Sequence, residues 1–311
     1  MDDPKQAKAK AVADLFYVER ADGMPLRGLR ELVGELPTDL RKIGDAFVHN
    51  VSSVTLTMGI PVNLADAAAG VRLWTQVRAS EWLRARADGL EGNPRSEEYI
   101  VNRVREQVDQ HIQEKGDLFR EDINNFLLAV HESKNVSSAV SELHAQGIVL
   151  IWSAFEVLAR DLFVFCLNRK PELVGKIIQN ESTKRLFQLK GLDFELLSQH
   201  RFDVSHAMGD ILVQIHDLGN LAAMKACFTA LFPNEAALRD SLSGSDLWLL
   251  SQRRNLIVHR RGIIDMKYLD STGETLPLGS LIRIRSSDIK QSLDTVCSVG
   301  ASLIKVVVSQ A

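Results

Sequence analysis

The chain has 311 residues, of which 45% are hydrophobic and 25% charged, a composition typical of globular proteins with a sizeable core. Its formal net charge is −3 and its pI is near 6.3, which excludes a global positive field that would draw the whole molecule to nucleic acid. Any site for a polyanion must therefore be local.

The first 135 residues predict several amphipathic helices. One begins at Thr38 or Asp39, and another ends at Gly89, after arginines that suit the negative end of a helix dipole. In a third helix, the apolar residues 100, 104, 108 and 112 form one stripe. No motif here indicates a chemistry, so this region could cover a second domain, bind a partner or restrain an activity.

A polar, turn-favouring stretch, "HESKNVSS", ends this region at residues 131–138. It predicts a domain boundary near residue 135. Residues 1–135 then form a helical region of unknown role, and residues 136–311 form a second domain.

The most hydrophobic segment, residues 147–167, has about the length of a membrane span. It carries Glu156, Arg160 and Asp161 near its middle, and such charges are costly in lipid. We therefore expect a buried core helix and no membrane partner.

Further helices follow, separated by turn-forming stretches. We expect breaks at "KGLD" (190–193), "HDLGN", "FPNE" and "SGSD". The last break leads into "LWLLSQRRNLIVHRRG", for which Ser245 or Asp246 is the expected N-cap and Gly262 the expected stop.

The C-terminal part changes character. "IIDMKYL" and "SLIRIR" are short alternating runs joined by the turn-rich "DSTGETLPLG", a pattern that predicts a small β-hairpin. A closing helix is expected from about Asp288 to Val308. The expected fold is thus mainly α, with this hairpin near the C-terminus.

The segment "RRNLIVHRRG" concentrates charge around a short apolar core. On a helix, Asn255 and His259 share a face, whereas Arg254 lies about 100° around the axis and reaches that face through its long side chain. Histidine exchanges a proton near neutral pH, and arginine binds phosphate oxygens with a fixed fork of donors. This pairing suits RNA cleavage, in which a base removes the proton of a ribose 2′-hydroxyl. A single histidine leaves the acid without a partner, so we expect a homodimer with a composite site.

The string "RNLIVH" resembles the R-x4-H pattern of the HEPN superfamily, in which a polar residue, often Asn, follows the Arg; Arg254, Asn255 and His259 match these positions. The longer "RRNLIVHRRGIID" and the earlier "SAFEVLARDLF" extend the resemblance over roughly residues 136–311. It implies a HEPN-type helical bundle and a dimeric, metal-independent endoribonuclease of toxin–antitoxin or antiviral systems, with RNA as substrate and an antitoxin or regulatory protein as a further partner.

Two other functions remain open. HEPN members without activity serve as binding or dimerisation modules, so a non-catalytic interaction or scaffold protein is the alternative. A helical regulatory protein unrelated to that superfamily is the third.

For the other polar residues around the motif, two roles remain open. The resemblance implies a supporting polar residue on the earlier helix, and Glu156 is the candidate, with either Arg254 or Arg160 as its ion partner. Arg253, Arg260 and Arg261 could contact the RNA backbone, or they could be a solvated helix end favoured by the helix dipole.

No metal or cofactor is expected. His200 and His206 lie near Asp203 and Asp210, but no Cys or Glu-x-x-His completes a known ligand spacing. The three cysteines lie far apart in apolar sequence and no signal segment is evident, which favours free thiols in the cytoplasm.

Overall fold

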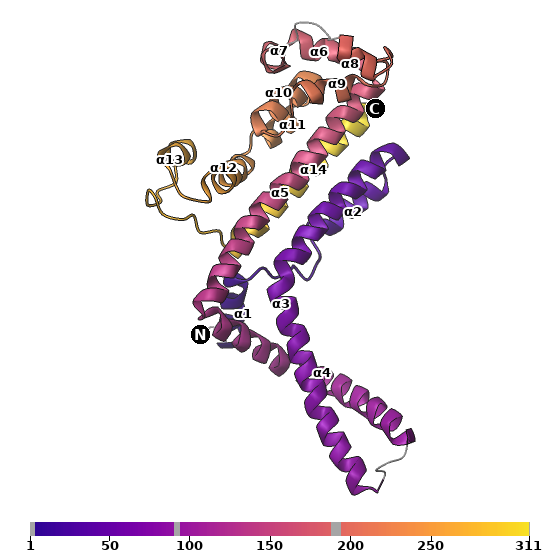
Figure 1. Ribbon diagram of the computed structural model, residues 1–311, viewed down its shortest axis with the longest axis vertical. Coiled ribbons are helices and arrows are strands. Elements are labelled where there is room, and N and C mark those ends of the chain that lie inside the picture. Colours follow the sequence, from indigo (N-terminus) through magenta and orange to yellow (C-terminus); the bar gives the residue numbers. More distant parts are fainter. Residues whose placement is uncertain (1–3, 90–93, 188–193, 311) are drawn as a thin grey trace. The chain divides into compact units, whose positions relative to one another are not determined.

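The computed structural model describes residues 4–89, 94–187 and 194–310, and it is mainly helical (Figure 1). The chain forms two compact units that alternate along the sequence. Unit 1 comprises Met1–Val18 and Thr57–Glu142, and unit 2 comprises Glu19–Leu56 and Leu143–Ala311. The break expected at residues 190–193 lies outside the described residues.

Unit 1 is built from four helical segments. They are α1 (Pro4–Leu15), the second part of α3 (Thr38–Ala87), α4 (Pro94–His131) and the first turns of α5 (Lys134–Arg169). One apolar cluster joins all four segments through Val12, Phe16, Ala65, Ile123, Leu127 and Val140. A second cluster joins α3 to the beginning of α4 through Ala85, Ile100 and Val104.

Unit 2 contains α2 (Leu26–Gly34), the first part of α3, most of α5 and the elements that follow it. These are η1 (Pro171–Leu173), α6 (Val174–Gln179), α7 (Glu181–Phe187), α8 (Phe194–Gln199), α9 (Met208–Ile215), α10 (Leu221–Leu231), α11 (Ala236–Leu242), α12 (Ser245–Arg260), α13 (Met266–Thr272) and α14 (Ser286–Gln310).

The expected core helix at residues 147–167 is confirmed. It lies within α5, where Trp152, Phe155 and Phe163 are among the largest fully buried side chains. Aromatic rings from later helices pack on it: Phe187 stacks on Phe163, and Phe228 meets the same ring edge-on. This helix therefore forms the centre of unit 2.

The compact units differ from a division at residue 135, because residues 19–56 pack with the C-terminal half of the chain. The Phe47 ring lies so close to Gly300 that an added Cβ there would be 2.6 Å from it, and Leu158 borders the same spot at 2.9 Å. Arg20 also forms an ion pair with Asp294 at 2.8 Å. The apolar face of α2 and early α3 thus completes the core of unit 2.

The helix expected to begin at Thr38 or Asp39 and the helix expected to end at Gly89 are one continuous helix, α3. It begins at Thr38 as predicted and runs for 50 residues through Pro61 to Ala87. Gly89 follows its end with φ of +73°. A proline removes one backbone donor from a helix, yet the flanking residues of α3 keep a helical conformation on both sides.

The prediction of a C-terminal β-hairpin is wrong. Within the described ranges there is no strand beyond one antiparallel bridge between Ile263 and Leu281. The reason lies at Asp265, whose side chain accepts a hydrogen bond from the Tyr268 amide at 2.9 Å and so begins α13. In the alternating sequence "IIDMKYL", residues 263–265 are therefore not helical, and residues 266–269 form the first turn of α13.

By length and composition, α3 and α14 are long and apolar enough to cross a membrane. In α14, half of the most apolar window is buried inside the protein, and buried core helices pass the same test. In α3 that share is 22%, and Leu64 and Val71 are among its exposed apolar side chains.

Candidate functional site

Helix α12 carries the predicted motif. It begins at Ser245 with Gly244 as its N-cap, so Ser245 and Asp246 lie in its first turn rather than at the cap. At the other end, Arg261 and Gly262 both have positive φ, and both amides donate to the Leu256 carbonyl. This left-handed ending is the stop predicted at Gly262, reached one residue earlier.

Arg254 is held by a neighbour on α12 and by a carboxylate of α5. Its Nη1 donates to Asn255 Oδ1 at 3.0 Å, and its Nη2 lies 3.5 Å from Glu156 Oε2. Its Nε has no hydrogen-bond partner in the described part of the chain. Of the two ion partners open for Glu156, the structure selects Arg254.

Glu156 has an unusual environment. Trp152 Nε1 donates to its Oε2 at 3.0 Å, so one carboxylate oxygen receives both the indole and the guanidinium. Burial raises the pKa of Glu156 above its ordinary value, while Arg254 opposes and Asp217 adds to this rise. A proton therefore resides on this carboxyl at a higher pH than on an exposed glutamate.

Asp217 is a neighbour of this site that the motif did not indicate. A Cβ added at Gly219 would lie 3.1 Å from Asp217 Oδ2 and 3.2 Å from Glu156 Oε1, so both carboxylates approach the same glycine. The sequence signal was the break "HDLGN", where a glycine allows a loop to pass close to α5.

We expect Glu156→Gln to change how stability depends on pH. Because the folded protein raises the pKa of Glu156, it binds that proton more tightly than the unfolded chain does. The contribution to stability is full below the ordinary pKa of 4.5 and declines as pH rises through the folded value. In the variant, the free energy of unfolding should decline less as the pH rises, which urea unfolding between about pH 4 and 7 measures. Glu172→Gln, at an exposed carboxylate of η1, is the matched control; an identical profile for wild type and Glu156→Gln would contradict the expectation.

His259 and Asn255 lie one helical turn apart on α12. The His259 side chain is exposed and Asn255 is half-buried beside Arg254. Leu250, Leu256 and Ile257 are buried and attach the helix to unit 2. Asn255 and His259 therefore share one face of an anchored helix, and Arg254 is connected to that face through its hydrogen bond to Asn255.

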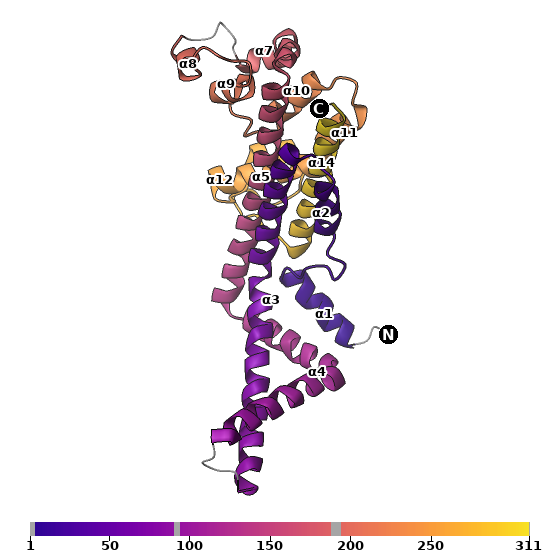
Figure 2. The ribbon, with the colours of Figure 1, turned by 90° about the vertical axis from the view of Figure 1, so that its right-hand side faces the viewer.

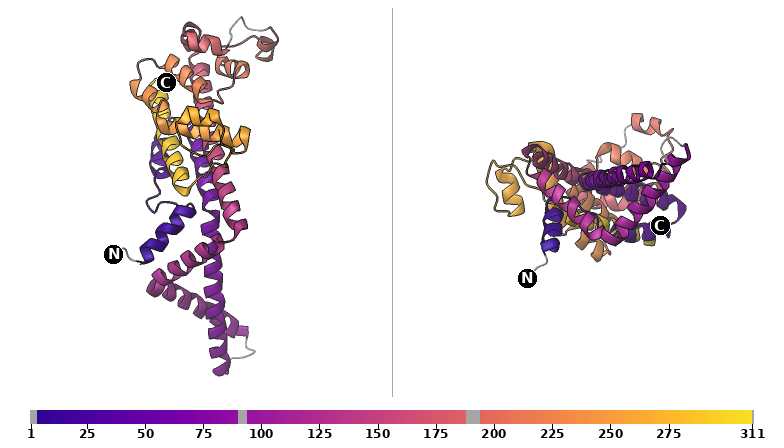
Figure 3. Two further views of the ribbon diagram at one scale, coloured as in Figure 1. Left: turned by 90° about the vertical axis from the view of Figure 1, so that its left-hand side faces the viewer. Right: turned by 90° about the horizontal axis from the view of Figure 1, so that it is seen from below.

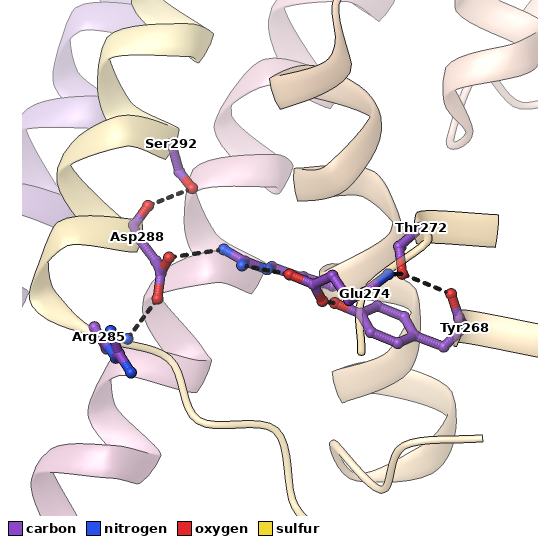
Figure 4. A network of polar contacts seen from close by, with 7 residues as sticks. Tyr268, Thr272, Glu274, Arg285, Asp288 and Ser292 are labelled. Atoms are coloured by element: carbon purple, nitrogen blue, oxygen red, sulfur yellow. Dashed lines mark hydrogen bonds and ion pairs between the residues drawn. The ribbon is translucent and has the colours of Figure 1, made fainter. Parts of the chain in front are cut away.

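Arg253 belongs to a separate polar network, which includes Tyr268, Glu274 and Asp288 (labelled in Figure 4). It donates to Asp288 at 3.0 Å and to Glu274 at 3.1 Å, and its side chain is only 14% exposed. Tyr268 donates to the other oxygen of Glu274 at 2.6 Å, and burial together with this bond raises the pKa of the Tyr268 hydroxyl. These contacts tie α12 to the loop after α13 and to the start of α14, so the guanidinium of Arg253 serves the fold.

Arg260 and Arg261 are exposed at the end of α12. Arg260 forms a 3.4 Å ion pair with Asp265, and its side chain is 59% exposed. Arg261 adopts the left-handed conformation that ends the helix. These two arginines present positive charge next to His259.

Of the remaining polar candidates, His206 and Asp210 both contact Asn168. Asn168 donates to Asp210 at 2.7 Å, and its carbonyl contacts His206 at 3.2 Å. No group of three or more His, Cys, Asp or Glu side chains among the described residues could hold a metal ion. Cys166, Cys227 and Cys297 are free, and burial raises the pKa of each to about 12.

The fold and this site define a mainly helical protein with an arginine–carboxylate cluster next to an exposed histidine. No protein-family model, curated protein or solved structure matches the chain. Function must therefore be argued from the site itself.

Proposed function

We propose that this protein is a metal-independent endoribonuclease of HEPN type, acting in the cytoplasm as a toxin or effector of antiviral defence. Arg254, Asn255 and His259 would carry the reaction, and Glu156 would support them. The observation that carries the proposal is the contact of Arg254 with both Asn255 and Glu156, one helical turn from exposed His259.

The chemistry uses the complementary properties of an imidazole, which can accept a proton, and a cationic guanidinium. His259 removes the proton of a ribose 2′-hydroxyl, and the 2′-oxygen attacks the adjacent phosphorus. Arg254 stabilises the negative charge that builds on the phosphoryl oxygens. The 5′-oxygen leaves with a proton from a general acid, which gives a 2′,3′-cyclic phosphate and a free 5′-hydroxyl. Arg260 and Arg261 would hold the RNA backbone through salt-dependent contacts.

A homodimer would supply the general acid as a second His259. Val258 in the last turn of α12, Ile263 just after it and Leu281 before α14 are exposed apolar residues. A bridge joins Ile263 to Leu281, so these two side chains come from directly opposed residues. Exposed apolar surface of this kind favours association, and association here would bring two copies of the histidine together.

The test is to incubate the purified full chain with total RNA in EDTA, alone and with cell extract as a source of a trigger. We expect fragments that end in 2′,3′-cyclic phosphate and 5′-hydroxyl groups, detected by end-labelling. A requirement for added divalent metal, or intact RNA under both conditions, would contradict the proposal.

The second candidate is a non-catalytic HEPN-like interaction protein. It is favoured by the 3.5 Å ion pair with Glu156, because this carboxylate occupies part of the guanidinium that a phosphate would need. Intact RNA in both arms, combined with a stable dimer or a captured partner that depends on Arg254, would support this function.

A further inference from the structure

Unit 1 contains a cleft between its two apolar clusters. Its volume is about 470 Å³, within the range of roughly 300–1,000 Å³ that small-molecule sites occupy. It lies between the second part of α3 and α4. The cleft and its lining fall wholly within the segment Thr57–Glu142.

The cleft exists because α4 bends. Lys115 has non-helical angles (φ −127°, ψ 23°), so the helix divides into two arms. In Figures 2 and 3 the two arms and the second part of α3 form three sides of a triangle. Each arm packs on α3 through its own cluster, and the interval between the clusters is left open.

The walls of the cleft are small or apolar along much of their length. Ala65, Ala68 and Ala69 line the α3 side, and their short side chains leave room for a ligand. Leu118 and Phe126 of α4 line it as well, and each is 52% exposed. A bound apolar group would cover these side chains and gain from their removal from water.

The polar lining is predominantly basic. Arg72 of α3 and His111 and Lys115 of α4 line the cleft, together with one carboxylate, Asp122. Arg72 and Lys115 are exposed, and neither has an ion-pair partner within the described ranges. Two unpaired cations beside an apolar wall match a ligand with an anionic head and an apolar body.

We propose that the α3–α4 cleft of unit 1 binds an amphipathic anion, a carboxylate or phosphate joined to an apolar chain or ring. The apolar body lies against Ala68, Leu118 and Phe126, and the head lies near Arg72 and Lys115. This site is independent of the ribonuclease proposal, because it uses no residue of α12 or of the Glu156 cluster.

The test titrates the full chain with decanoate, decyl phosphate and decyltrimethylammonium, each below its micelle-forming concentration, by isothermal titration calorimetry. We expect saturable binding of at least one anion at one per chain, at least about tenfold tighter than the ammonium compound, a difference set by the head group. Preference for decanoate or for decyl phosphate identifies the head group. Equal binding of the ammonium compound, or no saturable binding of either anion, would overturn the proposal.

Two alanines on α3 provide a matched pair of variants. Ala67 and Ala68 are both exposed, but only Ala68 lines the cleft. Ala68→Trp should weaken anion binding at least about tenfold by filling the site, while Ala67→Trp should bind like the wild type. Equal affinity in the two variants would place the ligand elsewhere and refute the site.

A charge reversal keeps the test valid if Ala68→Trp fails to fold, as judged by circular dichroism. The double variant Arg72→Glu/Lys115→Glu changes two exposed side chains and should preserve helicity. Its affinity for the anion should fall about tenfold, while its affinity for the ammonium compound should rise. Unchanged anion affinity would refute the role of these two cations.

Discussion

Replacing His259 with alanine is expected to lower the rate constant of RNA cleavage by roughly 10²–10⁴-fold, the range that a positioned general acid or base contributes. The side chain is exposed, so its removal should leave the free energy of unfolding almost unchanged. Single-turnover cleavage of a labelled RNA in EDTA measures the effect. His49→Ala, which removes an exposed histidine from α3, is the matched control.

Arg254→Ala should lower the same rate constant by roughly 10²–10³-fold, because it removes the donors that stabilise charge on the phosphate. It also leaves Glu156 without its ion partner, so the double variant Arg254→Ala/Glu156→Gln is needed. If this double variant folds normally and remains inactive, the loss is chemical. Full activity in His259→Ala or in the double variant would rule out the assigned roles.

Phe47→Ala is expected to reduce the free energy of unfolding of unit 2 by about 3–5 kcal/mol, the usual cost of truncating a buried phenylalanine. Phe47 is 1% exposed and packs against Gly300 of α14, so the truncation leaves a cavity. Urea unfolding followed by circular dichroism measures the loss.

The control for this prediction is Phe194→Ala in α8. Phe194 is 78% exposed, and its truncation should change the free energy of unfolding by less than about 0.5 kcal/mol. Equal effects of the two substitutions would mean that residues 19–56 are not part of the core of unit 2.

Local sequence patterns predicted those parts of the fold that depend on neighbouring residues. The core helix within α5, the start of α3 at Thr38 and the stop of α12 near Gly262 are all set by apolar spacing, charge or backbone freedom within a few turns. The hairpin failed for a local reason too. The capping bond from Asp265 outweighed a short alternating pattern, which favours a strand only when a partner strand continues.

The alternation of the two units could not be predicted in this way. Nothing in residues 19–56 says that their apolar face packs against α14 rather than against residues 57–135, because both choices bury the same stripe. Only the fit of Phe47 against Gly300 distinguishes them, and that is a tertiary contact.

The candidate site shows the same limit. Helix geometry predicted the shared face of Asn255 and His259. The choice of Glu156 followed from the resemblance to the HEPN superfamily, together with the rule that buried acids are paired. The network around Arg253 could not be foreseen, since its carboxylates, Glu274 and Asp288, lie after the helix in segments whose path depends on α13. Asp217 was missed because its approach to Glu156 depends on a loop.

The order of the units along the chain has a consequence for synthesis on the ribosome. Residues 19–56 emerge well before α5 and α14, with the whole segment 57–142 translated in between. At a translation rate of about 5–20 residues per second, roughly 4–17 s pass before α5, the first helix that packs on their apolar face, is synthesised. Unit 1 can fold once residue 142 has emerged, but unit 2 closes only after α14 is released. The apolar face formed by α2 and early α3 therefore stays exposed on the nascent chain until α5 and α14 have been made.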